Sequence, residues 1–399
     1  METSRSQPES RSIGASLLKE EDDENAVHDL DGAIHKLEIL FSMLGFYHHQ
    51  SSVHYSIFRS CVFFFITGFA LPIGIILYCN YFNHTSSYVE ESRIIELEIA
   101  VPASQIFLAF TSLFCVSHNL KKYSMWKFLF VDKRYEDLKD LHSQYVEKIN
   151  NFYQIFLWIV PCIIIKSIHA LDLMVFIYRN PWPLASVLLL LSIVSWTYLA
   201  TVFLAGCGLF CLICNLQIVH FEDYCKLLVT RTDVPLLLDD HIRLCHYLSK
   251  ISHRFRLHLL LVFFVSLATQ CFGLLQTAQN GVVNFTNTGD FFVSSAVQVI
   301  GIVLCLMAAT KISHRAQNVS SVTSKWHALA TCAIRHNVEA DSEITRIQSL
   351  HSQRQAFVMY LQCNNGGITM YGWVVDRGLI ATIVCIELSL LTFIFSGSV

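Results

Sequence analysis

The sequence predicts an all-α membrane protein that crosses the bilayer seven times. Three observations predict this class. Hydrophobic residues make up 53% of the 399 residues and charged residues only 15%, whereas soluble domains carry about 25% charged residues. Seven apolar runs are long enough to span a bilayer, for which about 20 residues suffice. Basic residues are concentrated in alternate connections between these runs, as they are in multi-pass proteins.

The fourth apolar run is the longest and could be cut into two spans. Pro181 and Pro183 mark its start, and only Gly206 and Gly208 interrupt it. We therefore predict one span here and seven in all. The predicted spans are 61–81, 99–118, 152–178, 183–218, 255–277, 291–311 and 368–395.

The chain before the first span has two parts. Residues 1–31 are rich in Ser, Glu and Asp and show no periodicity, which predicts a disordered leader. An amphipathic helix should follow, lying along the membrane surface or packing beneath the bundle. Its apolar residues recur at steps of three or four: Ile34, Leu37, Phe41, Leu44 and Tyr47.

The distribution of lysine and arginine predicts the orientation. These residues gather in the connections between the second and third, fourth and fifth, and sixth and seventh spans, whereas the other three connections contain only Arg93 and Arg179. Positive connections stay in the cytosol, so the N-terminus should be cytosolic and the C-terminus extracellular. Two glycosylation sequons, at Asn83 and Asn284, fall in connections assigned to the outside and are predicted to be modified.

Several classes of protein are excluded by the sequence. A G-protein-coupled receptor has seven spans in the opposite orientation. Metalloprotease, nucleophile-elbow, P-loop and dinucleotide-binding motifs are missing, so we expect no enzyme and no cofactor. The net charge of −3 predicts no nucleic-acid surface. Most of the 14 cysteines lie inside apolar runs as small hydrophobic residues, and no metal site is expected.

The last span carries three charges, Asp376, Arg377 and Glu387, at an insertion cost of about 2.5–3.5 kcal/mol for a charge at the bilayer centre. On a helix, Asp376 and Glu387 would lie about 20° apart around the axis and about 16 Å apart along it. The other residues on their shared face are Ile380, Ile383, Leu390 and Ile394.

Two interpretations of this face remain open. Fourfold assembly would give two acidic rings separated by an apolar constriction, which is typical of a weakly selective cation pore. Alternatively, Asp376 and Arg377 anchor the span at the cytosolic boundary, and Glu387 bonds a neighbouring helix.

The third span contains a stripe of ionisable residues, Lys166, His169 and Asp172. Such residues face the bundle interior or a water-filled cavity, which makes them candidates for a ligand pocket. An internal ion pair that fixes helix packing is the competing interpretation. Residues of other spans that could stand opposite this stripe are Gln105, Trp196, Tyr198 and Gln298.

The sequence resembles a plant family of seven-span proteins of unknown function, which are distant relatives of insect odorant and gustatory receptors. The resemblance covers the chain from about residue 35 onward. The Thr-Tyr signature that gustatory receptors carry near the end of the last span is matched only in part, by Thr392-Phe393. The motifs that carry the resemblance are Lys311–Gln317, Lys325-Trp-His327, Arg354-Gln-Ala356, Gly366–Thr369, Asp376-Arg377 and Glu387-Leu-Ser389.

The resemblance implies a homotetramer with a central pore lined by the last span. It also implies an anchor built from the inner parts of the fourth to seventh spans, and a pocket for an unknown small-molecule ligand among the earlier spans. We therefore expect residues 32–399 to form a ligand-gated, weakly selective cation channel in contact with membrane lipid. Its expected location is the plasma membrane, and an endomembrane is the alternative. A non-conducting receptor or scaffold that signals through cytosolic helices is the alternative, and a carrier ranks third.

Overall fold

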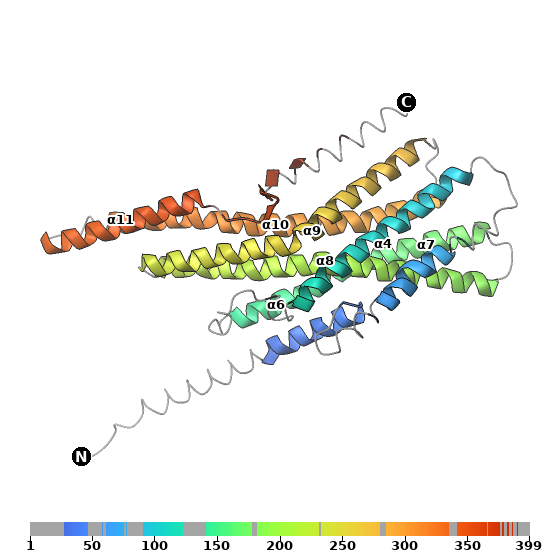
Figure 1. Ribbon diagram of the computed structural model, residues 1–399, viewed down its shortest axis with the longest axis horizontal. Coiled ribbons are helices and arrows are strands. Elements are labelled where there is room, and N and C mark those ends of the chain that lie inside the picture. Colours follow the sequence, from blue (N-terminus) through green and yellow to red (C-terminus); the bar gives the residue numbers. More distant parts are fainter. Residues whose placement is uncertain are drawn as a thin grey trace, which may run out of the picture.

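A computed structural model gives the fold as a long bundle of helices (Figure 1). It describes residues 28–46, 61–75, 91–122, 141–177, 182–230, 233–279, 285–334, 341–364 and 366–375, together with single positions including 58, 77, 129, 377, 378, 381, 382, 385 and 389. The elements are η1 (Phe65–Ala70), α4 (Glu91–Lys122), α6 (His142–Phe152), η4 (Tyr153–Trp158), α7 (Ile159–Ile177), α8 (Trp182–Thr230), α9 (Val234–Gln279), α10 (Phe285–Ile334), α11 (Asp341–Cys363), β1 (Thr369–Met370) and β2 (Trp373–Val374).

Five helical stretches in the described part of the chain are long and apolar enough to cross a membrane, and a shorter apolar helix covers Cys61–Ile75. Together they overlap the first six predicted spans, so the predicted all-α, multi-pass membrane fold is confirmed. The fourth run forms one uninterrupted helix, α8. The five long stretches are Ala100–Lys122, His142–Leu171, Ser186–Thr230, Val234–Gly273 and Asp290–Cys332.

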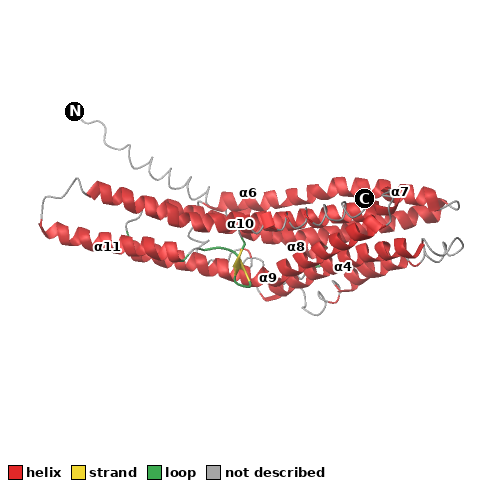
Figure 2. Ribbon diagram, turned by 90° about the horizontal axis from the view of Figure 1, so that it is seen from above, coloured by secondary structure: helices red, strands yellow, loops and turns green. Residues whose placement is uncertain are grey.

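The helices α8, α9 and α10 continue well beyond the length of a span. The 50 residues of α10 make a rod of about 75 Å, more than twice the thickness of the hydrocarbon core. At its far end α10 runs beside α11 (Figures 1 and 2), where the Arg354 guanidinium lies 5.2 Å from the centre of the Trp326 ring. In the described part of the chain, the connections predicted to be cytosolic therefore include long extensions of the spanning helices.

The central helix of the bundle is α8, because 94% of its most apolar window is buried, against 22–56% in the other four candidate spans. Its two glycines are packing positions rather than turns. A Cβ atom at Gly206 would lie 2.8 Å from Cβ of Ser112 in α4, and one at Gly208 would lie 2.8 Å from the Phe152 ring. Neighbouring helices can approach α8 this closely only where it lacks side chains.

The amphipathic segment near the N-terminus forms a helix over residues 28–43. Its apolar stripe, which includes Leu37 and Phe41, is buried. The Phe41 ring stacks on Phe152 with centroids 6.1 Å apart. Of the two placements that the sequence allowed, the helix thus takes the one against the bundle. Residues 1–27 of the predicted leader lie outside the described part of the chain.

The predicted start of the last span at residue 368 is wrong, because β1 and β2 form an antiparallel hairpin there. Tyr371 and Gly372 have φ angles of 49° and 91°, the left-handed pair that a tight two-residue hairpin turn requires. The Ile368 amide donates to Ser313 Oγ (3.0 Å) and the Thr369 amide to Ser252 Oγ (3.2 Å). These bonds fix the hairpin on α10 and α9, and described helical positions resume at Arg377.

Candidate functional site

The ionisable residues of the third span meet a carboxylate from another helix. Lys166 and His169 lie one turn apart on α7, and both side chains reach Asp290 on α10. The ammonium group of Lys166 pairs with Oδ2 of Asp290, and Nδ1 of His169 lies 2.8 Å from Oδ1. Two basic side chains from one helix therefore share one carboxylate of another.

Sequence reasoning missed Asp290 and proposed Asp172 in its place. The side chain of Asp172 lies outside the described part of the structure. Asp290 directly precedes the apolar run at 291–311 and therefore falls just outside the predicted sixth span. A carboxylate at the boundary of one span could have been weighed as the partner of a lysine inside another, since an intramembrane charge needs a counter-charge.

A row of polar side chains continues from Asp290 along α10. Ser294 and Gln298 follow at steps of four residues, so all three share one face. Nε1 of Trp196 in α8 donates to Ser294 Oγ at 3.4 Å, and Nε2 of Gln298 donates to Ser104 Oγ of α4 at 3.2 Å. The row thus connects α10 to α7, α8 and α4 in turn, and it includes two residues that the sequence placed here, Trp196 and Gln298.

The remaining predicted neighbours lie differently. The hydroxyl group of Tyr198 donates to the backbone oxygen of Leu44 at 3.2 Å, and its ring packs edge-on against Phe63 with centroids 5.1 Å apart. Tyr198 therefore contacts the N-terminal helix and the first span rather than the charged cluster. Gln105 is half-buried on α4 beside Ser104.

The charged cluster is buried on its basic side and open on its acidic side. The side chains of Lys166 and His169 are 7% and 5% exposed, whereas that of Asp290 is 46% exposed. A buried ammonium group is tolerated only beside a counter-charge, so Asp290 must stay close to Lys166. Its open side can still accept a hydrogen bond from a ligand, which gives this arrangement the chemistry of a recognition site.

The six predicted pore residues and both sequons lie outside the described residues: Asp376, Ile380, Ile383, Glu387, Leu390, Ile394, Asn83 and Asn284. Six other positions of the last span are described, and all are exposed in the single chain: Arg377, Gly378, Ala381, Thr382, Cys385 and Ser389. The Thr382 hydroxyl donates to the Gly378 oxygen at 2.9 Å, the four-residue step of a helix. Across the described residues, no three His, Cys, Asp or Glu side chains form a group that could hold a metal ion.

A family model described as "Protein of unknown function (DUF3537)" matches residues 32–353 and 335–386, and the chain belongs to this family. None of the curated proteins that were compared matches the sequence.

Two solved structures share the fold, both of the insect olfactory receptor OR5 from Machilis hrabei. The complex of this receptor with eugenol is similar with a TM-score of 0.60 and 14% sequence identity, over 93% of this chain and 99% of the receptor chain. The receptor alone gives the same TM-score and identity over 92% and 98%. The fold is thus that of an insect chemoreceptor.

Proposed function

We propose that the chain is one subunit of a ligand-gated, weakly selective cation channel, assembled from four copies around the last span. The observation that carries this proposal is the shared fold, which extends over 93% of this chain and 99% of an olfactory receptor chain. We also propose that the family is the plant group whose motifs the sequence resembles. In this assignment residues 32–399 form the channel domain, and the N-terminus lies in the cytosol of a plasma-membrane protein.

The exposure of the last span supports an assembly. Its six described positions are all exposed, and at about 100° per residue they would cover one face of a helix. Five of them are small or short residues, which allow helices to approach closely in a membrane. The predicted pore residues, including Asp376 and Glu387, would fall on the opposite face. One face can therefore pack against protein while the acidic face lines a lumen.

The ligand site in this proposal is the cluster of Lys166, His169 and Asp290 with its polar extension along α10. The similar receptor was solved in complex with eugenol, so the fold can accommodate a small organic molecule. The half-exposed carboxylate of Asp290 would accept a hydrogen bond from a ligand hydroxyl group. A ligand bound to Asp290 would then change the contacts between α10, which carries Asp290, and α7, which carries Lys166 and His169.

Conduction tests the proposal directly. The purified full-length protein is incorporated into planar bilayers, and currents are recorded with and without eugenol as a first probe. We expect cation currents whose preference over chloride falls in Glu387→Gln, because the neutral ring no longer attracts cations. Thr382→Val, on the opposite face, is the matched control and should keep the preference.

Thiol labelling tests the pore face independently. Cysteines introduced at 376, 380, 383, 387, 390 and 394 should change the current on labelling, whereas the native thiol of Cys385 should not. If no position responds, the pore assignment is wrong. An assembled particle of one chain, near 45.5 kDa, would also exclude the channel.

The alternative is a non-conducting receptor or scaffold that signals through its cytosolic helices. The extension of α8, α9 and α10 far beyond a bilayer's thickness (Figure 1) favours this class, because it provides a long surface for a partner. The receptor or scaffold would be supported if the bilayers carried no current and a ligand changed the solvent exposure of α11. Substrate uptake without current would support a carrier.

A further inference from the structure

A pocket of about 240 Å³ lies between α6 and η4, α8 and α10. It is separate from the charged cluster at Asp290. Asp290 and Lys311 mark the two ends of the apolar run on α10, and about 31 Å of helix separates them, close to the thickness of the hydrocarbon core. The pocket therefore lies at the membrane surface opposite to Asp290, the side that the distribution of basic residues predicts to be cytosolic.

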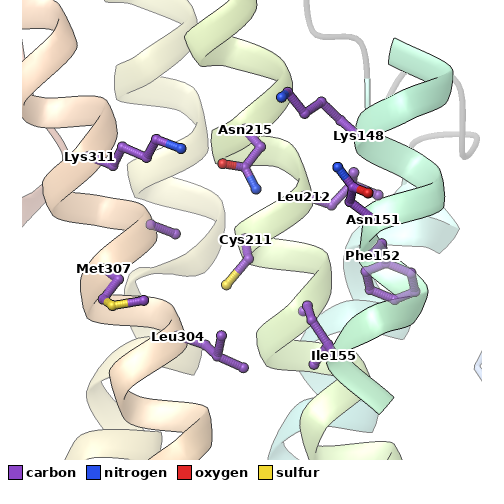
Figure 3. Close-up of a pocket in the computed structure, with 12 residues that line it drawn as sticks. Lys148, Asn151, Phe152, Ile155, Cys211, Leu212, Asn215, Leu304, Met307 and Lys311 are labelled. Atoms are coloured by element: carbon purple, nitrogen blue, oxygen red, sulfur yellow. The ribbon is translucent and has the colours of Figure 1, made fainter. Parts of the chain in front are cut away.

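The water-facing end of the pocket is polar and positive. Figure 3 shows the ammonium nitrogens of Lys148 and Lys311 pointing toward one another from α6 and α10, with the amide of Asn215 between them. Asn151 adds a second amide at the same level. Two ammonium groups and two amides supply many hydrogen-bond donors to a bound anion.

Among the described residues, little negative charge is present to neutralise these lysines. The acid paired with Lys148 is Glu147, 3.8 Å away and 64% exposed, a weak surface pair. On α8, Glu222 is paired with Arg315 at 3.0 Å. Among the described residues, no ion pair includes Lys311. The pocket thus keeps a positive charge for a ligand.

The membrane-facing end of the pocket is apolar. Its wall includes Phe152, Leu304 and Met307, and Met307 is 56% exposed. The absence of a side chain at Gly208 lets the Phe152 ring approach α8. A cationic end and an open apolar wall match the two halves of a membrane lipid.

We propose that this pocket binds an anionic lipid of the cytosolic leaflet. Lys148 and Lys311 hold its phosphate, and the first part of an acyl chain lies along Leu304 and Met307. The inner leaflet is the anionic one, and basic pockets between spanning helices on that side are suited to its headgroups. The bound lipid would join α6, α8 and α10. This inference does not rest on ion conduction.

The test is native mass spectrometry of the detergent-solubilised full-length protein, titrated with phosphatidylserine, phosphatidylcholine or glycerophosphoserine, which is the same headgroup without acyl chains. We expect phosphatidylserine to bind more tightly than either of the others. Lys148→Gln and Lys311→Gln should each weaken its binding about fivefold. Lys311→Arg should keep it, and Lys325→Gln, at an exposed position of the same helix, should leave it unchanged.

Three outcomes would overturn the inference. Equal affinity for phosphatidylserine and phosphatidylcholine would show that the pocket does not select a lipid by the negative charge of its headgroup. Equal binding of glycerophosphoserine would make the pocket a site for free phosphate compounds. An equal loss in Lys325→Gln would show a general surface effect. Because single lysine-to-glutamine changes at the water-facing end leave the apolar packing intact, the variants should fold, and their thermal unfolding without added lipid checks this.

Discussion

Asp290 is the residue on which the charged cluster depends. Replacement by Asn would leave the buried ammonium group of Lys166 without its counter-charge. Breaking a buried ion pair lowers the free energy of unfolding by about 3–5 kcal/mol. Because the Asp290 side chain is 46% exposed, we expect Asp290→Asn to lower it by a smaller amount, about 1–3 kcal/mol. Thermal unfolding in detergent measures it. Lys166→Met combined with Asp290→Asn should recover most of the loss, and no recovery would contradict the pairing.

The glycines of α8 allow a second prediction at the scale of single residues. Gly208→Ala would bring a methyl group within 2.8 Å of the Phe152 ring. We expect this overpacking to lower the free energy of unfolding by about 1–3 kcal/mol. Gly74→Ala is the control, since a Cβ there meets nothing within 4 Å; it should raise helix stability by about 0.5–1 kcal/mol. Equal effects of the two substitutions on the unfolding temperature would contradict the close packing of Phe152 against α8 at Gly208.

Sequence reasoning found part of the candidate site and missed another part. Lys166 and His169 are visible in a sequence because charges inside apolar runs are rare. The partner Asp290 is not, because it lies at the start of a different run and only the tertiary fold brings it to α7. The sequence also does not show which face of α8 packs against which neighbouring helix. Trp196 and Tyr198 are two residues apart, yet they contact α10 and the N-terminal helix respectively.

At the scale of elements, apolar length predicts the spans but not the hairpin. Residues 368–375 are as apolar as a helix of this bundle, so hydropathy extends the last span through them. What makes the hairpin is a left-handed turn at Tyr371 and Gly372 and two serines from distant helices. Of these, only the glycine is a local signal.

The hairpin also gives a test at this scale. Ser313→Ala would leave the buried amide of Ile368 without its 3.0 Å hydrogen bond, at an expected cost of about 1–3 kcal/mol. Ser324→Ala on the same helix is the matched control, because the Ser324 hydroxyl donates within its own helix, to the Ser320 oxygen one turn back. Amide hydrogen exchange at residues 368–375 should accelerate in the first variant alone. Unchanged exchange would show that the serine does not hold the hairpin.

For the whole molecule, the testable expectation is its orientation in the membrane. Asn83 and Asn284 should both be glycosylated when the chain is expressed in eukaryotic cells, because their connections are predicted to be outside. Glycosidase treatment should increase the electrophoretic mobility of the chain, and Asn83→Gln with Asn284→Gln should abolish this shift. A third sequon, Asn318-Val-Ser320, lies on α10 on the side predicted to be cytosolic, and glycans there would instead mean that the orientation is inverted.

The length of α10 has a consequence for how the chain can vary. Asp290, Lys311 and Trp326 lie on one unbroken helix, so each added residue turns everything beyond it by about 100°. A single insertion near Gly301 would direct Lys311 away from its pocket and Trp326 away from Arg354 while Asp290 stayed in place. The number of residues between two positions of α10 therefore fixes the directions in which their side chains point at the two membrane surfaces. Insertions and deletions should be tolerated better in connections such as the one at Asp233, because a change there does not rotate the side chains of α10.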